Sequence, residues 1–144
     1  MHRHGYKGRK FGRETDQRQA LMRGLVRSLF LHQSITTTTA KAKEVRRYAE
    51  KLVSIARKNT LANRRLLISR INDIEVANLL MDVIAPQIKR DSGYLRVISA
   101  GNRKGDHAEM STISFVDTIE IAKEADKEEK KPKGEKKAEK EESK

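Results

Sequence analysis

The start of the chain decides the fold through three successive segments: MHRHGYKGRKFGRE at residues 1–14, TDQRQALMRGLVRSLFLHQS at 15–34, and ITTTT at 35–39. The first segment is basic, contains three glycines and offers almost nothing apolar to bury. It therefore cannot build a core, and a polyanion is the partner that best supplies its counter-charge and fixes its conformation. The alternative is a solubilising terminus without a partner.

The second segment is predicted to be an amphipathic helix that begins at Thr15 or Asp16 and ends near residues 32–34. Asp16 and Gln19 have the spacing of a capping box at its start. Its apolar residues recur at helical spacing and form one stripe: Leu21, Met22, Leu25, Val26 and Leu29. The third segment is β-branched throughout and favours a short strand.

The remainder of the chain continues with helices and ends in a hairpin. Apolar spacing predicts a second helix over about 40–58, a third capped by Asn59–Thr60, and a fourth that Asn72 starts and Pro86 ends. Asp91–Gly93 reads as a turn. Residues 94–99 and 110–116 have strand composition and predict a β-hairpin whose loop carries two cations between glycines. A mobile surface loop fits that segment equally well.

The charge is unevenly distributed along the chain. The formal net charge is +12, and all of this surplus comes from the first half. Lys43, Arg47 and Lys51 follow one another at four-residue spacing, where like charges oppose helix formation slightly. A solvated basic face is the plainest interpretation of one such helix. The same pattern in the arm and at Arg23 and Arg27 favours a surface that faces nucleic-acid phosphates.

The composition argues against several classes of protein. There is no cysteine, so disulfides, thiolate chemistry and cysteine-based zinc sites are excluded. No apolar run approaches the roughly 20 residues of a membrane span, and the basic start does not resemble a signal peptide. The four histidines do not form a ligand set, and nucleotide-binding or nucleophile motifs are absent. We expect a soluble intracellular protein without catalytic machinery, cofactor or metal.

Three regions follow from these patterns. Residues 1–14 are predicted to form a basic nucleic-acid-binding arm, and residues 15–120 a single α+β domain. Residues 121–144 are almost wholly Lys, Glu and Ala, without an apolar stripe, and are predicted to be a disordered tail.

The sequence also resembles a known family, the bacterial large-subunit ribosomal proteins that carry the number seventeen. The resemblance covers residues 1 to about 120, and no single motif decides it, but the ordered set is specific. The matching residues are Arg3-His4, Gly8–Arg13, Arg18–Ala20, Ile35, Thr37-Thr38, Lys41–Arg47, Ala62–Leu66, Gly93–Arg96, Gly105-Asp106, Met110 and Val116-Asp117.

The resemblance implies a structural protein of the large ribosomal subunit. Such a protein binds large-subunit ribosomal RNA, lies in the cytoplasm within the ribosome near the peptide exit tunnel, and touches neighbouring ribosomal proteins. It has no membrane or small-molecule partner. The implied fold is two-layered α+β, in the order helix, strand, three helices and a two-stranded hairpin, which agrees with the order read from periodicity.

The candidate RNA-binding residues combine the basic residues of the first half, the hairpin cations and residues of the family motifs. They are Arg3, His4, Lys7, Arg9, Lys10, Arg13, Arg18, Arg23, Arg27, Lys41, Lys43, Arg46, Arg47, Arg64, Arg65, Tyr94, Arg96, Arg103 and Lys104. We expect most of the cations to meet phosphates and not base edges.

Two other classes of protein are alternatives to a ribosomal protein. A free DNA- or RNA-binding regulator would usually carry a recognition helix with base-reading side chains and form a symmetric dimer. An RNA-modifying enzyme would need a cofactor pocket and a catalytic base or nucleophile. The sequence shows neither set of features.

Deletion of residues 123–144 should leave incorporation into the large subunit intact. The nine lysines of this segment are almost balanced by eight acids, and it offers no face that could dock. Co-sedimentation of the truncated chain with large subunits measures this. If the truncated chain fails to incorporate while its circular dichroism is unchanged, the tail has a role that its composition does not reveal.

Overall fold

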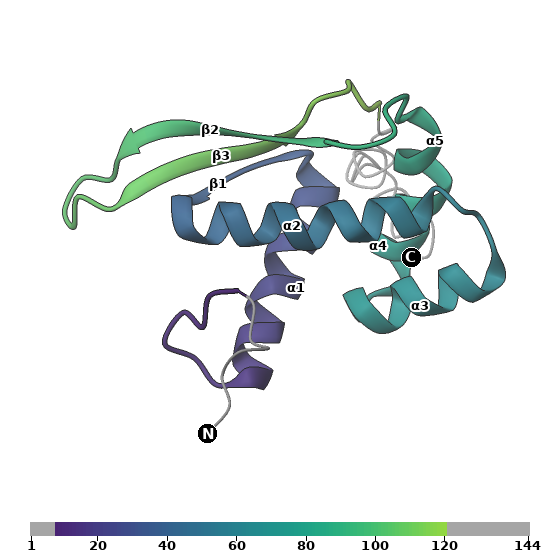
Figure 1. Cartoon of the computed structure of the whole chain (residues 1–144), viewed down its shortest axis with the longest axis horizontal. Coiled ribbons are helices and arrows are strands. Elements are labelled where there is room, and N and C mark those ends of the chain that lie inside the picture. The colour runs from purple at the N-terminus through teal and green to yellow at the C-terminus, as the bar shows by residue number, and fades with distance from the viewer. Residues whose placement is uncertain (1–7, 121–144) are drawn as a thin grey trace, which may run out of the picture.

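The computed structural model describes residues 8–120 as two layers, a small antiparallel sheet lying on a group of helices (Figure 1). In chain order the elements are α1 (Thr15–His32), β1 (Ser34–Thr38), α2 (Thr39–Ala56), α3 (Leu61–Ile71), α4 (Ile74–Asn78), the π-helical turn η1 (Leu79–Ile84), α5 (Ala85–Gln87), β2 (Leu95–Asn102) and β3 (Glu109–Phe115). The predicted α+β class and element order are confirmed, with α4, η1 and α5 together forming the third helix after β1.

The sheet brings together strands that lie far apart in the sequence. Its strand order is β1-β3-β2, and both pairings are antiparallel. Thr36 lies opposite Thr112 in one pairing, and Val97 lies opposite Ile113 in the other. The hairpin was predicted from its two strand-like runs, but the insertion of β3 between β1 and β2 was not.

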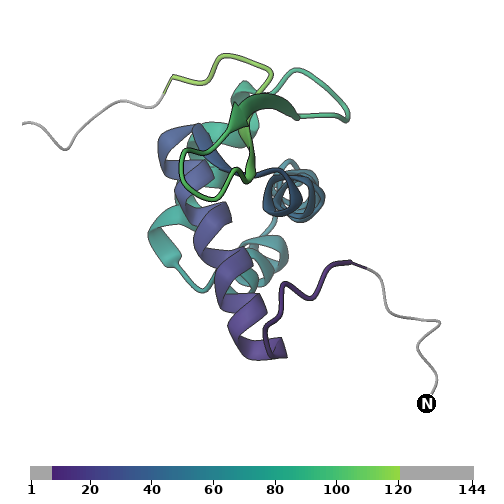
Figure 2. The ribbon, with the colours of Figure 1, turned by 90° about the vertical axis from the view of Figure 1, so that its left-hand side faces the viewer.

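One hydrophobic core lies between the sheet and the helices. Phe30 of α1, Leu52 of α2 and Ile113 of β3 are fully buried within it. Figure 2 shows α1 running steeply beneath the sheet, with α2 seen end-on beside it. Among the polar contacts at this interface, the hydroxyls of Thr39 and Ser111 lie 2.7 Å apart, and Ser111 is 2% exposed. The contact satisfies the Ser111 hydroxyl, which burial would otherwise leave unbonded.

The α2–α3 junction follows the predicted capping pattern. The Thr60 hydroxyl accepts the backbone N–H of Asn63 at 3.3 Å, which caps α3. The Asn63 side chain in turn donates to the carbonyls of Ile55 and Lys58, at 3.3 and 2.8 Å. Asn63 therefore adds a second bond to two carbonyls that already accept backbone N–H groups, and so ties the start of α3 to the end of α2.

Two predicted caps are wrong. Asp73 caps α4 through the backbone N–H of Val76 at 3.1 Å, where Asn72 was expected. Asn72 has a φ of 58° and ends α3 instead, in the left-handed conformation that asparagine tolerates. At the start of α1, Glu14 occupies the cap position without a side-chain hydrogen bond. The spacing of a capping motif can often be matched by two adjacent residues. It therefore predicts the start of a helix only to within a residue or two.

The helix that Pro86 was expected to end continues to Gln87. Leu79–Ile84 is π-helical, and Pro86 lies in the first turn of α5. Proline is tolerated at this position because its missing N–H has no obligatory partner there. The apolar spacing predicts that Val76, Leu79, Leu80, Val83 and Ile84 face inward. Val76, Leu80 and Ile84 are buried, Leu79 and Val83 are half-buried, and Met81 is also buried.

Ile113→Ala should destabilise the protein by about 2–5 kcal/mol, because Ile113 is fully buried in the central strand and its truncation leaves a cavity. Ile98→Ala is the matched control. It removes the same atoms from the adjacent strand, but Ile98 is 54% exposed, so it should cost about 0.5 kcal/mol or less. Urea unfolding of both variants measures the difference. Equal losses would show that the sheet does not bury the predicted face.

Asp73 should make the free energy of unfolding depend on pH in the acid range. The backbone N–H of Val76, and then the Arg27 guanidinium, lower the pKa of Asp73 below its ordinary 3.8. Its contribution is therefore complete above that value and is lost as the pH falls through the lower pKa of the folded state. Asp73→Asn retains a capping oxygen but neither titrates nor pairs with Arg27.

Urea unfolding of the native chain and of Asp73→Asn should therefore be compared between pH 7 and pH 2. The native chain should be the more stable at neutral pH, and its advantage should shrink below about pH 4. An advantage that stays constant over this range would mean that the carboxylate has no special stabilisation in the folded state.

Candidate nucleic-acid interface

A hollow of about 540 Å³ lies between the arm, α1, α2 and the end of α3, and is called the basic groove below. Six cationic side chains line it against a single acid, Glu44. The cations are Arg9, Arg18, Arg23, Arg47, Lys51 and Arg70. Like charges brought together in this way create a positive potential that attracts a polyanion.

The arm forms one wall of the basic groove through a tight turn. The backbone N–H of Arg13 donates to the carbonyl of Lys10 at 3.2 Å, and the residues between them, Phe11 and Gly12, have φ values of 57° and 61°. Gly8 lies against α2 with a φ of +106°, and a Cβ there would stand 3.3 Å from a carboxylate oxygen of Glu44. The positive φ favours glycine at this position, and the space beside the flexible Glu44 side chain is tight.

The helices forming the other walls are tied together at one carbonyl. The Arg70 carbonyl, in the last turn of α3, accepts the Tyr48 hydroxyl at 3.0 Å and the Arg23 Nε–H at 3.1 Å. Carbonyls at a helix end lack intrahelical partners, so these two bonds satisfy a group that would otherwise need water. They also link α1, α2 and α3 around the groove and fix the two side chains that make them.

The basic face that the sequence predicts for α2 borders the groove. Arg47 and Lys51 line it one helical turn apart, and Lys43 is exposed one turn earlier. Arg47 lies 3.9 Å from Glu44, at the limit of an ion pair, and its side chain is 60% exposed. Such an exposed pair contributes little, so Arg47 remains available to another anion. On the same helix, Arg46 pairs with Glu50 at 3.1 Å, and Lys41 is half-buried.

Two further candidate cations, Arg64 and Arg27, are engaged in ion pairs within the protein. Arg64 pairs with Asp82 at 2.6 Å and lowers the pKa of that carboxyl. Arg27 pairs with Asp73, which also caps α4. In sequence each of these pairs is separated by at least 18 residues. Their charge is already partly neutralised, so they carry less weight in an interface than a count of cations suggests.

The hairpin loop contains a third such pair. Arg103 and Asp106 lie 2.5 Å apart, and Arg103 is the main cause that lowers the pKa of Asp106 to about 2, assisted by the Ala108 N–H. Lys104 beside them is exposed. The loop was predicted to offer two cations, and one of the two is bound to its own carboxylate.

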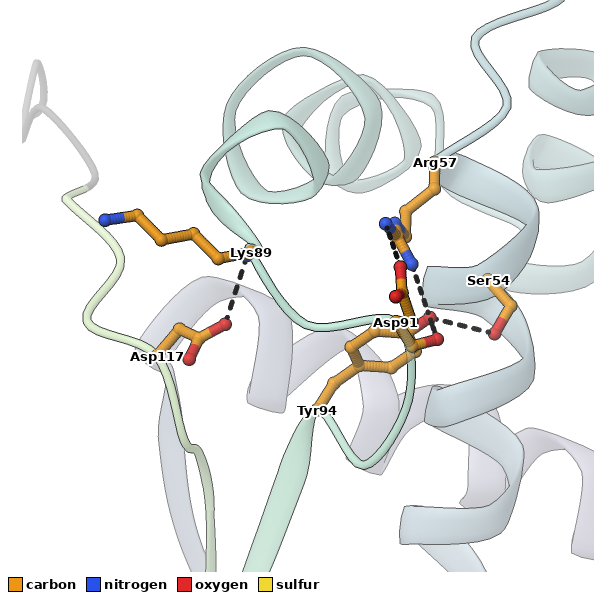
Figure 3. Close-up of polar contacts among 6 residues, drawn as sticks. All are labelled: Ser54, Arg57, Lys89, Asp91, Tyr94 and Asp117. Carbon is orange, nitrogen blue, oxygen red and sulfur yellow. Dashed lines mark hydrogen bonds and ion pairs between the residues drawn. The ribbon is translucent and has the colours of Figure 1, made fainter.

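Tyr94 is a structural residue in this fold (Figure 3). It is 3% exposed, and its hydroxyl donates to the Asp91 carbonyl at 2.7 Å. Arg57 of α2 donates to the Tyr94 hydroxyl at 3.3 Å and to the Asp91 carboxylate at 3.0 Å. These bonds, with the Ser54 hydroxyl at 3.5 Å, fasten the start of β2 to α2. We therefore leave Tyr94 out of the proposed RNA-binding residues.

The outer face of the sheet carries hydroxyl groups that sequence reasoning did not select. Ser34 and Thr36 are exposed there, and the hydroxyls of Thr36 and Thr112 are 3.0 Å apart. Arg96 is exposed on β2 opposite Ser114. The alternation within ITTTT is the signal that could have found this face, because every second residue of a strand faces outward.

The other candidates either do not line the groove or lie outside the described residues. Arg65 is exposed on α3, and Lys10 and Arg13 are exposed in the turn of the arm. Arg3, His4 and Lys7 lie outside the described residues, as does the predicted tail. Among residues 8–120, no cluster of three potential metal ligands occurs. No helix in that range is long and apolar enough to cross a membrane.

Comparison with known proteins gives the family. The family model described as "Ribosomal protein L17" matches residues 21–116. A relative from Thermodesulfovibrio yellowstonii, named "Large ribosomal subunit protein bL17", is 45% identical over 90% of this chain and 98% of its own length. The protein of the same name from Sphingopyxis alaskensis is 48% identical over 80% of this chain and 84% of its own. The chain therefore belongs to the ribosomal protein L17 family, whose members are structural proteins of the large ribosomal subunit.

Proposed function

We propose that the protein holds folded large-subunit ribosomal RNA in place, with the basic groove as the centre of its RNA-binding surface. The main support for this proposal is the lining of the groove. Six cationic side chains from four segments of the chain line it, together with one acidic side chain. A core-building role does not account for that arrangement, since the groove lies at the surface and like charges repel. A ribose-phosphate chain adds negative charge to a groove whose lining holds six cations and one acid.

The surrounding cations extend this surface. Lys43 continues the line of α2, and Lys10 and Arg13 lie in the arm beside the groove. Arg65 on α3, and Arg96 and Lys104 on the hairpin, offer further contacts at a distance from it. Cations of this kind position a protein on RNA without reading its sequence, and position is what a scaffold requires.

The wider assignment rests on the family. We propose that the protein acts in the cytoplasm within the ribosome, near the peptide exit tunnel, and touches neighbouring large-subunit proteins there. Its contribution is to hold RNA and not to catalyse a reaction. Membership of the L17 family supports this, and so do relatives whose printed name places them in the large subunit.

The paired substitution Arg47→Ala and Lys51→Ala should lower the salt dependence of RNA binding. Each side chain that contacts a phosphate contributes about one released counterion or less, so the slope of log K against log salt should fall by up to about two. The measurement is a salt titration of binding to deproteinised large-subunit ribosomal RNA.

The control is the pair Lys130→Ala and Lys131→Ala, which changes the net charge equally in a segment rich in acids. It should leave the slope nearly unchanged. If both pairs reduce the slope equally, affinity follows total charge and the groove has no special role. Loss of affinity at an unchanged slope for the Arg47 and Lys51 pair would instead indicate base or shape recognition.

A further inference from the structure

We propose that the basic groove receives one unstacked nucleotide of the RNA, with its base against an apolar wall and its phosphate at the Arg47–Lys51 rim. The inference rests on the proposed function and names the form of RNA that the groove accepts. It depends on the size of the hollow and on the mixture of side chains lining it, and bonds that restrain two of those side chains assist it.

The size of the groove exceeds what a phosphate group needs. Its volume of about 540 Å³ falls within the range of roughly 300–1,000 Å³ typical of small-molecule sites. A duplex is too broad to enter a hollow of this volume, whereas one nucleotide turned out of a stack fits. RNA-binding proteins commonly recognise such unstacked nucleotides in loops and bulges.

The lining joins cations to an apolar wall. Phe11 of the arm, Met22 of α1 and Tyr48 of α2 line the groove together with the cations. A phosphate gains nothing from aromatic rings, and its oxygens are better placed against donors alone. A nucleobase, in contrast, stacks on aromatic side chains and arginine planes, and every base offers a flat face for this.

Two of the side chains that line the groove are held by bonds within the protein. The hydroxyl of Tyr48 is held by the Arg70 carbonyl at 3.0 Å, which restrains its ring on the wall. The Nε of Arg23 is held by the same carbonyl at 3.1 Å. Side chains that are already restrained lose less entropy when they bind a ligand.

The chain lacks tryptophan, so a single introduced tryptophan reports on its own site alone. Phe11→Trp places the reporter in the groove, and Leu61→Trp places one on α3, where Leu61 is 65% exposed. Both variants should be titrated with deproteinised large-subunit ribosomal RNA and with an RNA duplex that has no unpaired nucleotides. Binding is followed separately by co-sedimentation.

We expect the ribosomal RNA to quench the emission of Phe11→Trp strongly and that of Leu61→Trp weakly, and the duplex to quench neither strongly. If the ribosomal RNA binds both variants but quenches them equally, no base enters the groove and the inference is overturned while the proposed function stands. If the RNA binds neither variant nor the native chain, the proposed function fails as well.

Substitutions at Tyr48 separate stacking from charge. Tyr48→Leu removes the ring and should weaken binding to the ribosomal RNA by about 5- to 150-fold, the range found for loss of one stacked base, without changing the salt slope. Tyr48→Phe keeps the ring, removes the bond to Arg70, and should bind within about threefold of the native chain. Equal losses for the two variants, with their circular dichroism unchanged, would assign the effect to the hydroxyl and overturn the stacking.

Discussion

The structure depends on the burial of one face of α2. This helix contacts all three strands as well as α1, α3 and η1. Its inward residues are almost entirely excluded from solvent: Ala42, Val45, Ala49, Leu52, Val53 and Ala56. Small residues alternate with larger ones along this face, which allows the sheet and the other helices to approach closely. Because that face is fixed in the core, Arg47 and Lys51 on the remaining surface are fixed beside the arm.

The helices and strands could be predicted largely from the sequence, because their signals are local. The apolar stripe at helical spacing predicted the position of α1, whose start and end match the expected ones. The run of threonines predicted the position of β1 to within one residue. The strand order could not be predicted in this way. Ser34–Thr38 pairs with residues more than 70 positions later. The composition of either strand does not identify the strand with which it pairs. The shift of a cap from Asn72 to Asp73 has a similar origin, since Asp73 also meets Arg27 of α1.

The sequence predicts that positive charge is concentrated in the candidate site, but it does not predict how the cationic side chains are arranged in space. The concentration of cations in the first half led to the arm, α1 and α2, which do form the basic groove. The sequence did not show which arginines are neutralised inside the protein. Arg64 and Arg27 find their carboxylates on the fourth helical segment, and a charge count treats them like Arg47. The anchoring of Tyr94 could not be predicted either, because two of its hydrogen-bond partners, Arg57 and Ser54, lie more than 35 positions earlier in the chain.

The central position of β3 has a consequence for the order in which the chain folds. Synthesis proceeds from the N-terminus, and β3 is the last strand to be made, yet both other strands pair with it. Until residue 115 has left the ribosome, β1 has no partner and the sheet cannot close, because contacts distant in sequence form only when both segments are present. The arm, α1, α2 and α3, which bear the groove, are complete much earlier. The cationic segments of a nascent chain are thus complete before its own sheet has formed.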